Sequence, residues 1–193
     1  MTYSCDGNFR YSIELVLQKE CNSVVDFDKN AAIGVYDSSG TVLIHRFYLT
    51  SPTVDTLEGN TFDPCLGFPS SVCLEQGRYK QSISLAPRPG GYTFVHQRCC
   101  RPSGITNIKN SNTQGNTFTV HIPDPGSFCN NAPSPKNQRP LALCLGKPFS
   151  IDRSFIDPDG DSLTYTLSKP IIGGGADLTQ VNGPNGPVPD PPS

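Results

Sequence analysis

The sequence predicts an all-β protein: a disulfide-stapled, antiparallel, immunoglobulin-like β-sandwich followed by a partial second β-sandwich module. Three observations predict this fold class. Apolar and polar residues alternate in short runs, turn residues separate the runs, and eight cysteines are spread over 193 residues. Alternation with a period of two is typical of a strand with one buried face, whereas an amphipathic helix repeats its apolar residues every three or four positions.

Six runs carry the strand pattern in the first part of the chain. In residues 10–18 the odd-numbered residues from 11 to 17 are apolar, as expected of a half-buried strand. A turn sequence, Asp37-Ser38-Ser39-Gly40, separates residues 32–36 from residues 41–49 and predicts a hairpin. The other runs are residues 78–85, 92–98 and 116–122. Short strands separated by turns predict an antiparallel sandwich.

A proline-rich stretch divides the chain into three parts. Residues 1–125 are expected to form the disulfide-rich sandwich, and residues 126–140 a Pro-rich connector, because proline lacks the N–H donor that a central strand needs. Residues 141–193 are expected to begin a second β module and to end in a Gly/Pro-rich tail. The strand-like pieces of this module, at 141–145, 148–151 and 163–167, are too few to close a sandwich. They are expected to dock on the first domain or to pair with a partner strand.

The eight cysteines predict disulfides formed in an oxidising compartment, and hence an extracellular or cell-surface protein. No CxxC pair occurs, so zinc sites and thioredoxin-type redox chemistry lose their usual signature. Local pairing favours Cys65 with Cys73 and Cys129 with Cys144, although the sequence alone does not fix the connectivity. Neighbouring cysteines on one strand point to opposite faces, so different partners are expected for Cys99 and Cys100. The predicted disulfide cysteines are Cys5, Cys21, Cys65, Cys73, Cys99, Cys100, Cys129 and Cys144.

Charge and hydropathy exclude two classes of partner. The formal net charge is -2, without the clustered basic face that nucleic-acid binding requires, so no nucleic-acid partner is expected. No apolar run approaches the ~18 residues that span a bilayer, so no membrane insertion is expected. Met1 precedes no basic and apolar leader, and we therefore expect a mature or excised segment.

The sharpest local motif is an acidic turn. Asp157, Asp159 and Asp161 are spaced at i, i+2 and i+4 around a proline and a glycine, which lets three carboxylates converge. Ca²⁺ takes six to eight oxygen ligands and would relieve their mutual repulsion. The spacing differs from that of an EF-hand, because glycine stands at the fourth position and no glutamate at the twelfth. The alternative is an exposed acidic turn that binds no metal.

The sequence does not predict an enzyme. It contains no GxSxG elbow, no HExxH, no P-loop and no GxGxxG that opens a helix. His45, His96 and His121 each lie in a strand-like run, where a histidine is more often a packed or surface residue than a general base. His96 and Cys100 would lie on one face, but ~13 Å apart along the strand, too far for proton transfer.

Two parts of the chain resemble known families. NNAP (130–133) followed by DPDGDSLTYTL (157–167) resembles the start of a cadherin-like or PKD-like module of bacterial surface proteins. In those families the Asn-Ala-Pro stretch marks the junction between modules and the acidic loop precedes a strand. The resemblance implies calcium binding at Asp157, Asp159 and Asp161, with Asn131 as a weaker candidate ligand.

The first part, through QRCCR and the DPC…VC loop, resembles ectodomain modules of large Bacteroidetes cell-surface proteins. Many of these carry a gliding-motility-associated C-terminal domain and leave the cell by type IX secretion. The resemblance implies an extracellular structural or adhesive module, in the form of a calcium-stiffened stalk or a filament subunit joined by strand exchange. Its partners would be other copies or other modules of the same surface protein. The alternative is a carbohydrate-binding module of a secreted protein, whose ligands would be glycans.

Overall fold

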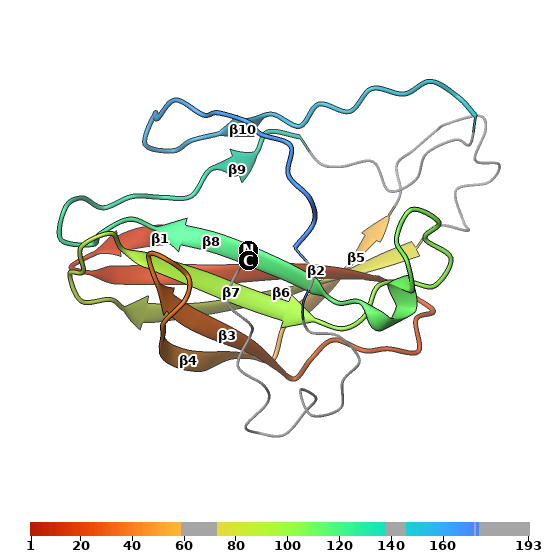
Figure 1. Cartoon of the computed structure of the whole chain (residues 1–193), viewed down its shortest axis with the longest axis horizontal. Helices are drawn as coiled ribbons and strands as arrows, with labels where there is room; N and C mark the ends of the chain where they lie inside the picture. The colour runs from red at the N-terminus through yellow and green to blue at the C-terminus, as the bar shows by residue number, and fades with distance from the viewer. Residues whose placement is uncertain (59–72, 138–145, 172, 174–193) are drawn as a thin grey trace.

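Two four-stranded antiparallel sheets face each other in a β-sandwich (Figure 1). The computed structural model describes residues 1–58, 73–137, 146–171 and 173. One sheet has the order β1-β2-β6-β5 and the other β4-β3-β7-β8. The strands are β1 (Thr2–Gly7), β2 (Arg10–Glu20), β3 (Asn30–Asp37), β4 (Leu43–Thr50), β5 (Thr53–Glu58), β6 (Cys73–Ser84), β7 (Tyr92–Arg98) and β8 (Asn116–Ile122). A short 3-10 helix, η3 (Ser111–Thr113), precedes β8, and a two-stranded ribbon, β9 (Ser134–Pro135) with β10 (Phe155–Ile156), follows it.

The strand connections are those of an immunoglobulin-like sandwich. Each strand pairs with a neighbour in sequence, β1 with β2, β3 with β4, β5 with β6 and β7 with β8. The pairings of β2 with β6 and of β3 with β7 then join two hairpins within each sheet. This order matches the two sheets of an immunoglobulin domain, with β4 added at the edge of the second sheet. The predicted all-β, disulfide-stapled sandwich is therefore confirmed.

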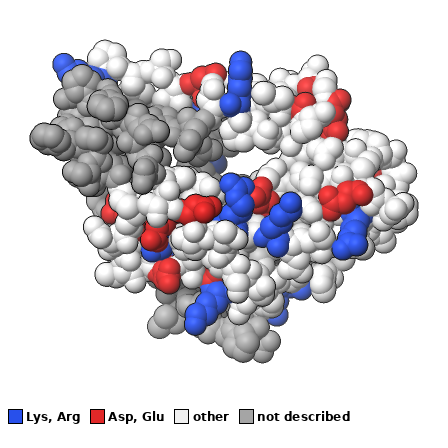
Figure 2. All heavy atoms as spheres, turned by 180° about the vertical axis from the view of Figure 1, so that it is seen from behind, with Lys and Arg blue, Asp and Glu red and all other residues white. Residues whose placement is uncertain are grey.

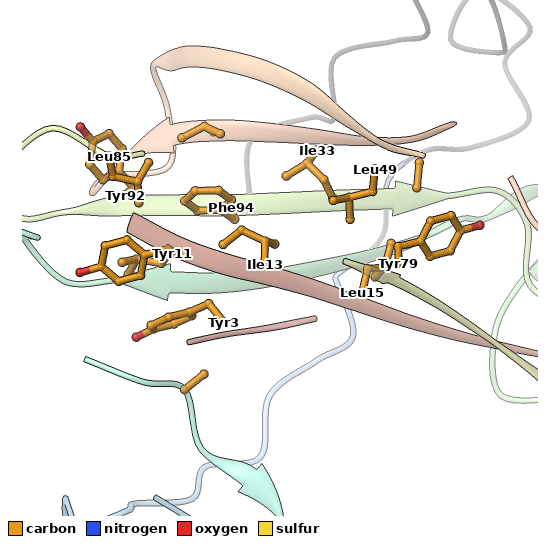
Figure 3. Packing of buried hydrophobic residues seen from close by; sticks show 14 of the residues in the cluster. Tyr3, Tyr11, Ile13, Leu15, Ile33, Leu49, Tyr79, Leu85, Tyr92 and Phe94 are labelled. Carbon is orange, nitrogen blue, oxygen red and sulfur yellow. The ribbon is translucent and has the colours of Figure 1, made fainter. Parts of the chain in front are cut away.

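The alternation seen in the sequence separates an inner from an outer face. Tyr11, Ile13 and Leu15 of β2 are almost fully buried, and in Figure 3 they point toward Ile33 and Phe94 of the opposite sheet. Side chains from the two inner faces interdigitate, as in other sandwich cores. Burial of this apolar surface provides the main driving force for folding.

Tyrosine hydroxyls at the margin of this core find backbone partners. The Tyr79 hydroxyl donates to the Asp28 carbonyl oxygen at 2.7 Å, and the Tyr92 hydroxyl donates to the Ala86 carbonyl oxygen at 2.9 Å. Burial raises the pKa of Tyr79 to about 12, so the hydroxyl stays protonated and keeps donating. These bonds let large rings fill the core while their polar ends remain satisfied.

Two strands lack the expected sequence pattern. In β1 only Tyr3 is buried, and in β5 none of the side chains of residues 53–57 is buried. The two strands lie at the two edges of the first sheet, where each has a strand neighbour on one side only among the described residues. Edge strands need little apolar alternation, which explains why the sequence does not reveal them.

The strands predicted for the second module are wrong where they can be checked. Residues 148–151 and 163–167 form no strand, and the ribbon is made instead by Phe155–Ile156 and Ser134–Pro135. Residues 141–145 lie outside the described residues. Alternation indicates that a segment is suited to pairing, but a strand forms only where a second strand supplies the hydrogen bonds. The division into 1–125, 126–140 and 141–193 stays a prediction.

Two predicted disulfide pairings are wrong. Cys73 bonds to Cys21 and not to Cys65, because the β2–β6 register brings the ends of these strands together. Cys129 bonds to Cys5 and not to Cys144, because the chain after β8 returns alongside β1. The Cα atoms of the two pairs are 5.4 and 5.5 Å apart, respectively. Cys65 and Cys144 lie outside the described residues.

The expectation of different partners for Cys99 and Cys100 is also wrong, because these two residues bond to each other. Strand β7 ends at Arg98, so the alternation of faces that motivated the expectation does not extend to the two cysteines.

Within the described part of the chain, no helix is long and apolar enough to cross a membrane.

Candidate functional site

The residues after β8 form an arm, defined here as 129–137 and 146–171, that docks on the edge strand β1. The Ala132 amide donates to the Tyr3 carbonyl oxygen at 3.0 Å, and the Cys5 amide donates to the Asn131 Oδ1 at 2.9 Å. The Cys5–Cys129 disulfide fixes the same contact covalently. Pairing groups that an edge strand would leave exposed are thereby satisfied, which protects the edge from pairing with another chain.

Asn131 connects this edge to the acidic turn. Its backbone N–H donates to Asp159 Oδ2 at 2.6 Å, and its side-chain Nδ2 donates to Asp159 Oδ1 at 2.8 Å. Both oxygens of one carboxylate thus accept from a single residue, and hydrogen bonds to an ionised carboxylate are stronger than neutral ones. Because Asn131 Oδ1 also accepts from Cys5, one side chain joins β1 to a turn 28 residues further along the chain.

The acidic turn is organised by its first carboxylate. Asp157 Oδ1 accepts from the amides of Asp159, at 2.9 Å, and Asp161, at 3.4 Å. Gly160 adopts a φ of 81°, a conformation that glycine reaches without steric cost. This arrangement is an Asx turn, in which an aspartate side chain substitutes for a backbone acceptor.

The arm is also fastened near its far end. The Thr117 amide of β8 donates to the Ile171 carbonyl oxygen at 3.3 Å. Between the two attachments, the Lys136 amide donates to the Ser154 carbonyl oxygen at 2.9 Å and extends the β9–β10 ribbon. Strands β1 and β8 are edge strands of different sheets, and Figure 1 shows the arm lying over this side of the sandwich.

Tyr3, a buried residue of β1, contacts the arm through its hydroxyl group. Asn130 Nδ2 donates to the Tyr3 hydroxyl oxygen at 2.6 Å. The pKa of Tyr3 is raised, first by burial, and the negative charges of Asp159 and Asp157 raise it further, while the bond from Asn130 lowers it. Asn130 lies in the NNAP stretch that the sequence analysis singled out, whereas no motif in the sequence pointed to Tyr3 as part of the junction.

The structure brings some of the predicted calcium ligands together. Asn131 and Asp159 are in direct contact, and Asp157 holds the turn through its Oδ1. In the part of the chain that the structure describes, no three His, Cys, Asp or Glu side chains form a group that could hold a metal ion. Oxygen donors that suit Ca²⁺ are nevertheless available, since each carboxylate oxygen has a second lone pair. Calcium binding stays a prediction.

Charges of both signs are mixed over the face shown in Figure 2. Lys19 lies 2.7 Å from Glu75, and Arg78 pairs with Glu14 across the first sheet. Ion pairs at a protein surface contribute little to stability, typically below about 1 kcal/mol. This face therefore offers no concentrated charge of a single sign to a ligand.

His96 is packed between the sheets. It is 1% exposed, its Nδ1 lies 3.0 Å from the Ala32 carbonyl oxygen, and its ring stacks on Phe118 at 6.3 Å. The Nε2 is buried and lacks a hydrogen-bond partner. Burial is the main cause that lowers the pKa of His96, so the ring is neutral in the folded protein.

Comparison with protein-family models, with curated proteins and with solved structures finds no match to this chain. Its function must therefore be inferred from its own residues, and the junction between arm and sandwich combines a disulfide with hydrogen bonds between residues far apart in the sequence.

We predict that Asn131→Ala lowers the free energy of unfolding by about 2 kcal/mol, because both side-chain hydrogen bonds are lost, the one from the Cys5 amide and the one to Asp159, whose carboxylate keeps only the backbone donor. Urea denaturation measures the change, and hydrogen exchange at the Ala132 amide should accelerate. Asn137→Ala is the matched control. It removes one exposed bond to Asp152 and should cost less than about 0.5 kcal/mol. Equal effects of the two substitutions would contradict a special role for Asn131.

We predict that stability falls as the pH drops through 6.5, the ordinary pKa of histidine. The unfolded chain then binds a proton that the folded His96 resists, so acid favours unfolding by up to about 1.4 kcal/mol per pH unit. Chemical denaturation at pH 7.5 and 5.5 tests this. His96→Gln should remove that part of the pH dependence, whereas His45→Gln, at an exposed position, should retain it. An unchanged slope in the His96 variant would refute the assignment.

Proposed function

We propose that this chain is an extracellular structural or adhesive module of a bacterial cell-surface protein. The observation that carries the proposal is the double attachment of the arm to β1, covalently through Cys5–Cys129 and through the hydrogen bonds that join Asn131 to Cys5 and Ala132 to Tyr3. A module that spaces or joins its neighbours needs a fixed exit direction for the chain. A covalent bond and hydrogen bonds at one edge supply such a direction.

The cysteine chemistry supports an extracellular location. Three disulfides connect described residues, and such bonds persist in oxidising compartments. A bacterial cell surface is the setting implied by the resemblance of QRCCR and neighbouring segments to Bacteroidetes ectodomain modules. Partners in that setting would be other copies or other modules of the same surface protein.

Calcium would add stiffness at the acidic turn. Asp157, Asp159 and Asp161 would hold the ion, with Asn131 as a weaker fourth ligand. A bound Ca²⁺ supplies positive charge that offsets the repulsion of three neighbouring carboxylates. Asp159 already contacts Asn131, so order gained in the turn would be passed to the edge of the sandwich.

We predict that millimolar Ca²⁺ raises the melting temperature relative to chelator. A ligand at ~100 times its Kd adds about 2.7 kcal/mol, which corresponds to about 5–10 °C for a chain of this size. The double variant Asp157→Asn/Asp161→Asn should lose the shift, and Asp55→Asn in β5 should keep it. Equal melting temperatures for the wild type in Ca²⁺ and in chelator would exclude the calcium site but leave the structural proposal to the next experiment.

A carbohydrate-binding module is the second candidate, and exposed aromatic rings favour it. Phe149 is 65% exposed and Tyr165 is 62% exposed, both on the arm. Flat exposed rings are the groups on which sugar faces stack. The sequence has no Trp, which is the usual platform for this interaction.

A glycan panel separates the two functions. We expect no saturable binding of bacterial or plant polysaccharides by the wild-type protein, measured by array and confirmed by calorimetry. Binding that is lost in Phe149→Ala or Tyr165→Ala, but kept in the control Phe9→Ala, would replace the structural proposal with the carbohydrate one. Phe9 is a suitable control because it is also exposed, at 47%, but lies in the β1–β2 turn.

A further inference from the structure

The side of the sandwich away from the arm has two open strand edges. In the part of the chain that the structure describes, strand β4 ends the second sheet and pairs only with β3. In the first sheet, β5 pairs with β6 only as far as Arg78, so residues 79–84 of β6 have β2 as their one strand neighbour among the described residues. Each open edge presents backbone N–H and C=O groups that can pair with another strand.

An apolar hollow of about 380 Å³ lies between these edges. Its lining residues are Val35, Ile44, His45, Phe47, Gln81, Ile83, Ser84, Leu85, Ala86 and Tyr92. None of them is acidic. Exposed apolar side chains continue the surface along β4, where Ile44 is 40% exposed and Leu43 39% exposed. Apolar surface gathered beside open strand edges is typical of a site where another chain docks.

The arm carries a segment that has the pattern of a strand but no strand partner. In residues 162–168, Leu163, Tyr165 and Leu167 alternate with serine and threonine. Leu167 is fully exposed, at 102%, and Tyr165 is 62% exposed. The segment forms no strand in the single chain. Its pattern of one apolar and one polar face is what a strand needs in order to cover a half-open core.

The chain holds this segment away from its own hollow. The contact of Asp159 with Asn131 precedes the segment, and the bond between Ile171 and Thr117 follows it. Both attachments lie on the side of β1 and β8, whereas β4 and the open half of β6 lie on the other side (Figure 1). The segment can therefore reach such a hollow only on another molecule.

We propose that residues 162–168 of one copy add as a strand to the hollow between β4 and β6 of a second copy. The inference rests on the proposed structural function and names its partner. The donor segment meets open backbone groups along one edge, while Leu163, Tyr165 and Leu167 enter the apolar hollow and the hydroxyl side chains face solvent. For this, Tyr165 exchanges its contacts within the arm, where its hydroxyl accepts from the Phe155 amide at 3.0 Å and its ring centroid lies 6.5 Å from that of Phe155, for contacts in the hollow.

Length and charge agree with this assignment. The donor extends ~13 Å from Leu163 to Leu167, and the open edge of β6 extends ~17 Å over residues 79–84. Asp161 directly precedes the donor, and His45 is among the residues that line the acceptor. Glu14 is paired with Lys80 in the strand register, but its carboxylate already binds Arg78.

Donor and acceptor surfaces on opposite sides of one molecule form a heterologous contact. Such contacts build open chains or rings and do not close at a dimer, because every added copy still has one free surface of each kind. We therefore expect head-to-tail assembly of this protein.

Sedimentation of the full chain, at micromolar to millimolar concentration, tests the proposal. The mass of the wild type should rise past the dimer as the concentration increases. Leu167→Asp removes the donor at a fully exposed position, and Ile44→Asp removes the acceptor, so each variant alone should stay monomeric. Val24→Asp is the matched control: Val24 is 101% exposed, lies between β2 and β3, and should not affect assembly.

An equimolar mixture of the two variants provides the decisive comparison. One intact donor and one intact acceptor remain, so the mixture should form dimers and stop there. A labelled peptide, DGDSLTYTLSKP (159–170), should bind the Leu167→Asp variant and not the Ile44→Asp variant. Saturable binding to the Leu167→Asp variant tests the acceptor independently of the stability of the Ile44 variant, and a scrambled peptide of the same composition should bind neither.

A wild-type chain that stays monomeric at every concentration would overturn the proposal, as would assembly that persists in both variants or a mixture that stays monomeric. These outcomes are distinct from failure of the structural function. A monomer that binds no glycan refutes only the strand addition, whereas a monomer that binds glycan through Phe149 or Tyr165 refutes both.

Discussion

Closure of the β1 edge is the constraint on which the rest of this molecule depends. Strand β1 has a single strand neighbour, and the arm supplies its second set of contacts through Asn131, Ala132 and Cys129. Without these contacts the arm would have no fixed direction, the acidic turn would lose the donors that hold Asp159, and the edge would be open to pairing. The two sides of the sandwich therefore differ in how far they are covered. The arm covers the side of β1 and β8, and the side of β4 and β6 exposes an apolar hollow.

Much of the sandwich could be predicted because burial of one face leaves a periodic trace in the sequence. Strands β7 and β8 begin and end where the alternation does, at Tyr92–Arg98 and Asn116–Ile122. Edge strands β1 and β5 were not predicted, because few of their side chains are buried and little selects an apolar residue at every second position. Residues 163–167 show the opposite case, in which the alternation is strong but the single chain provides no strand to pair with it.

The junction was predicted only in part, because it depends on register and on long-range return of the chain. Asn131 and Asp159 were expected to share a site as oxygen ligands, and in the structure they are in contact as donor and acceptor. The partner of Cys73 follows from the pairing of Glu20 with Leu74, which no local spacing reveals. The role of Tyr3 is likewise invisible in the sequence, since its hydroxyl partner, Asn130, lies 127 residues away.

The Cys5–Cys129 bond has a mechanical consequence. It joins residues 124 positions apart, and all eight strands of the sandwich except the start of β1 lie within the loop it closes. Tension applied between the beginning of the chain and the arm would therefore pass from residue 5 to residue 129 through a covalent bond. The hydrogen bonds that hold the sheets together would carry almost none of that tension, so the sandwich could keep its shape under a pull that would otherwise unzip it.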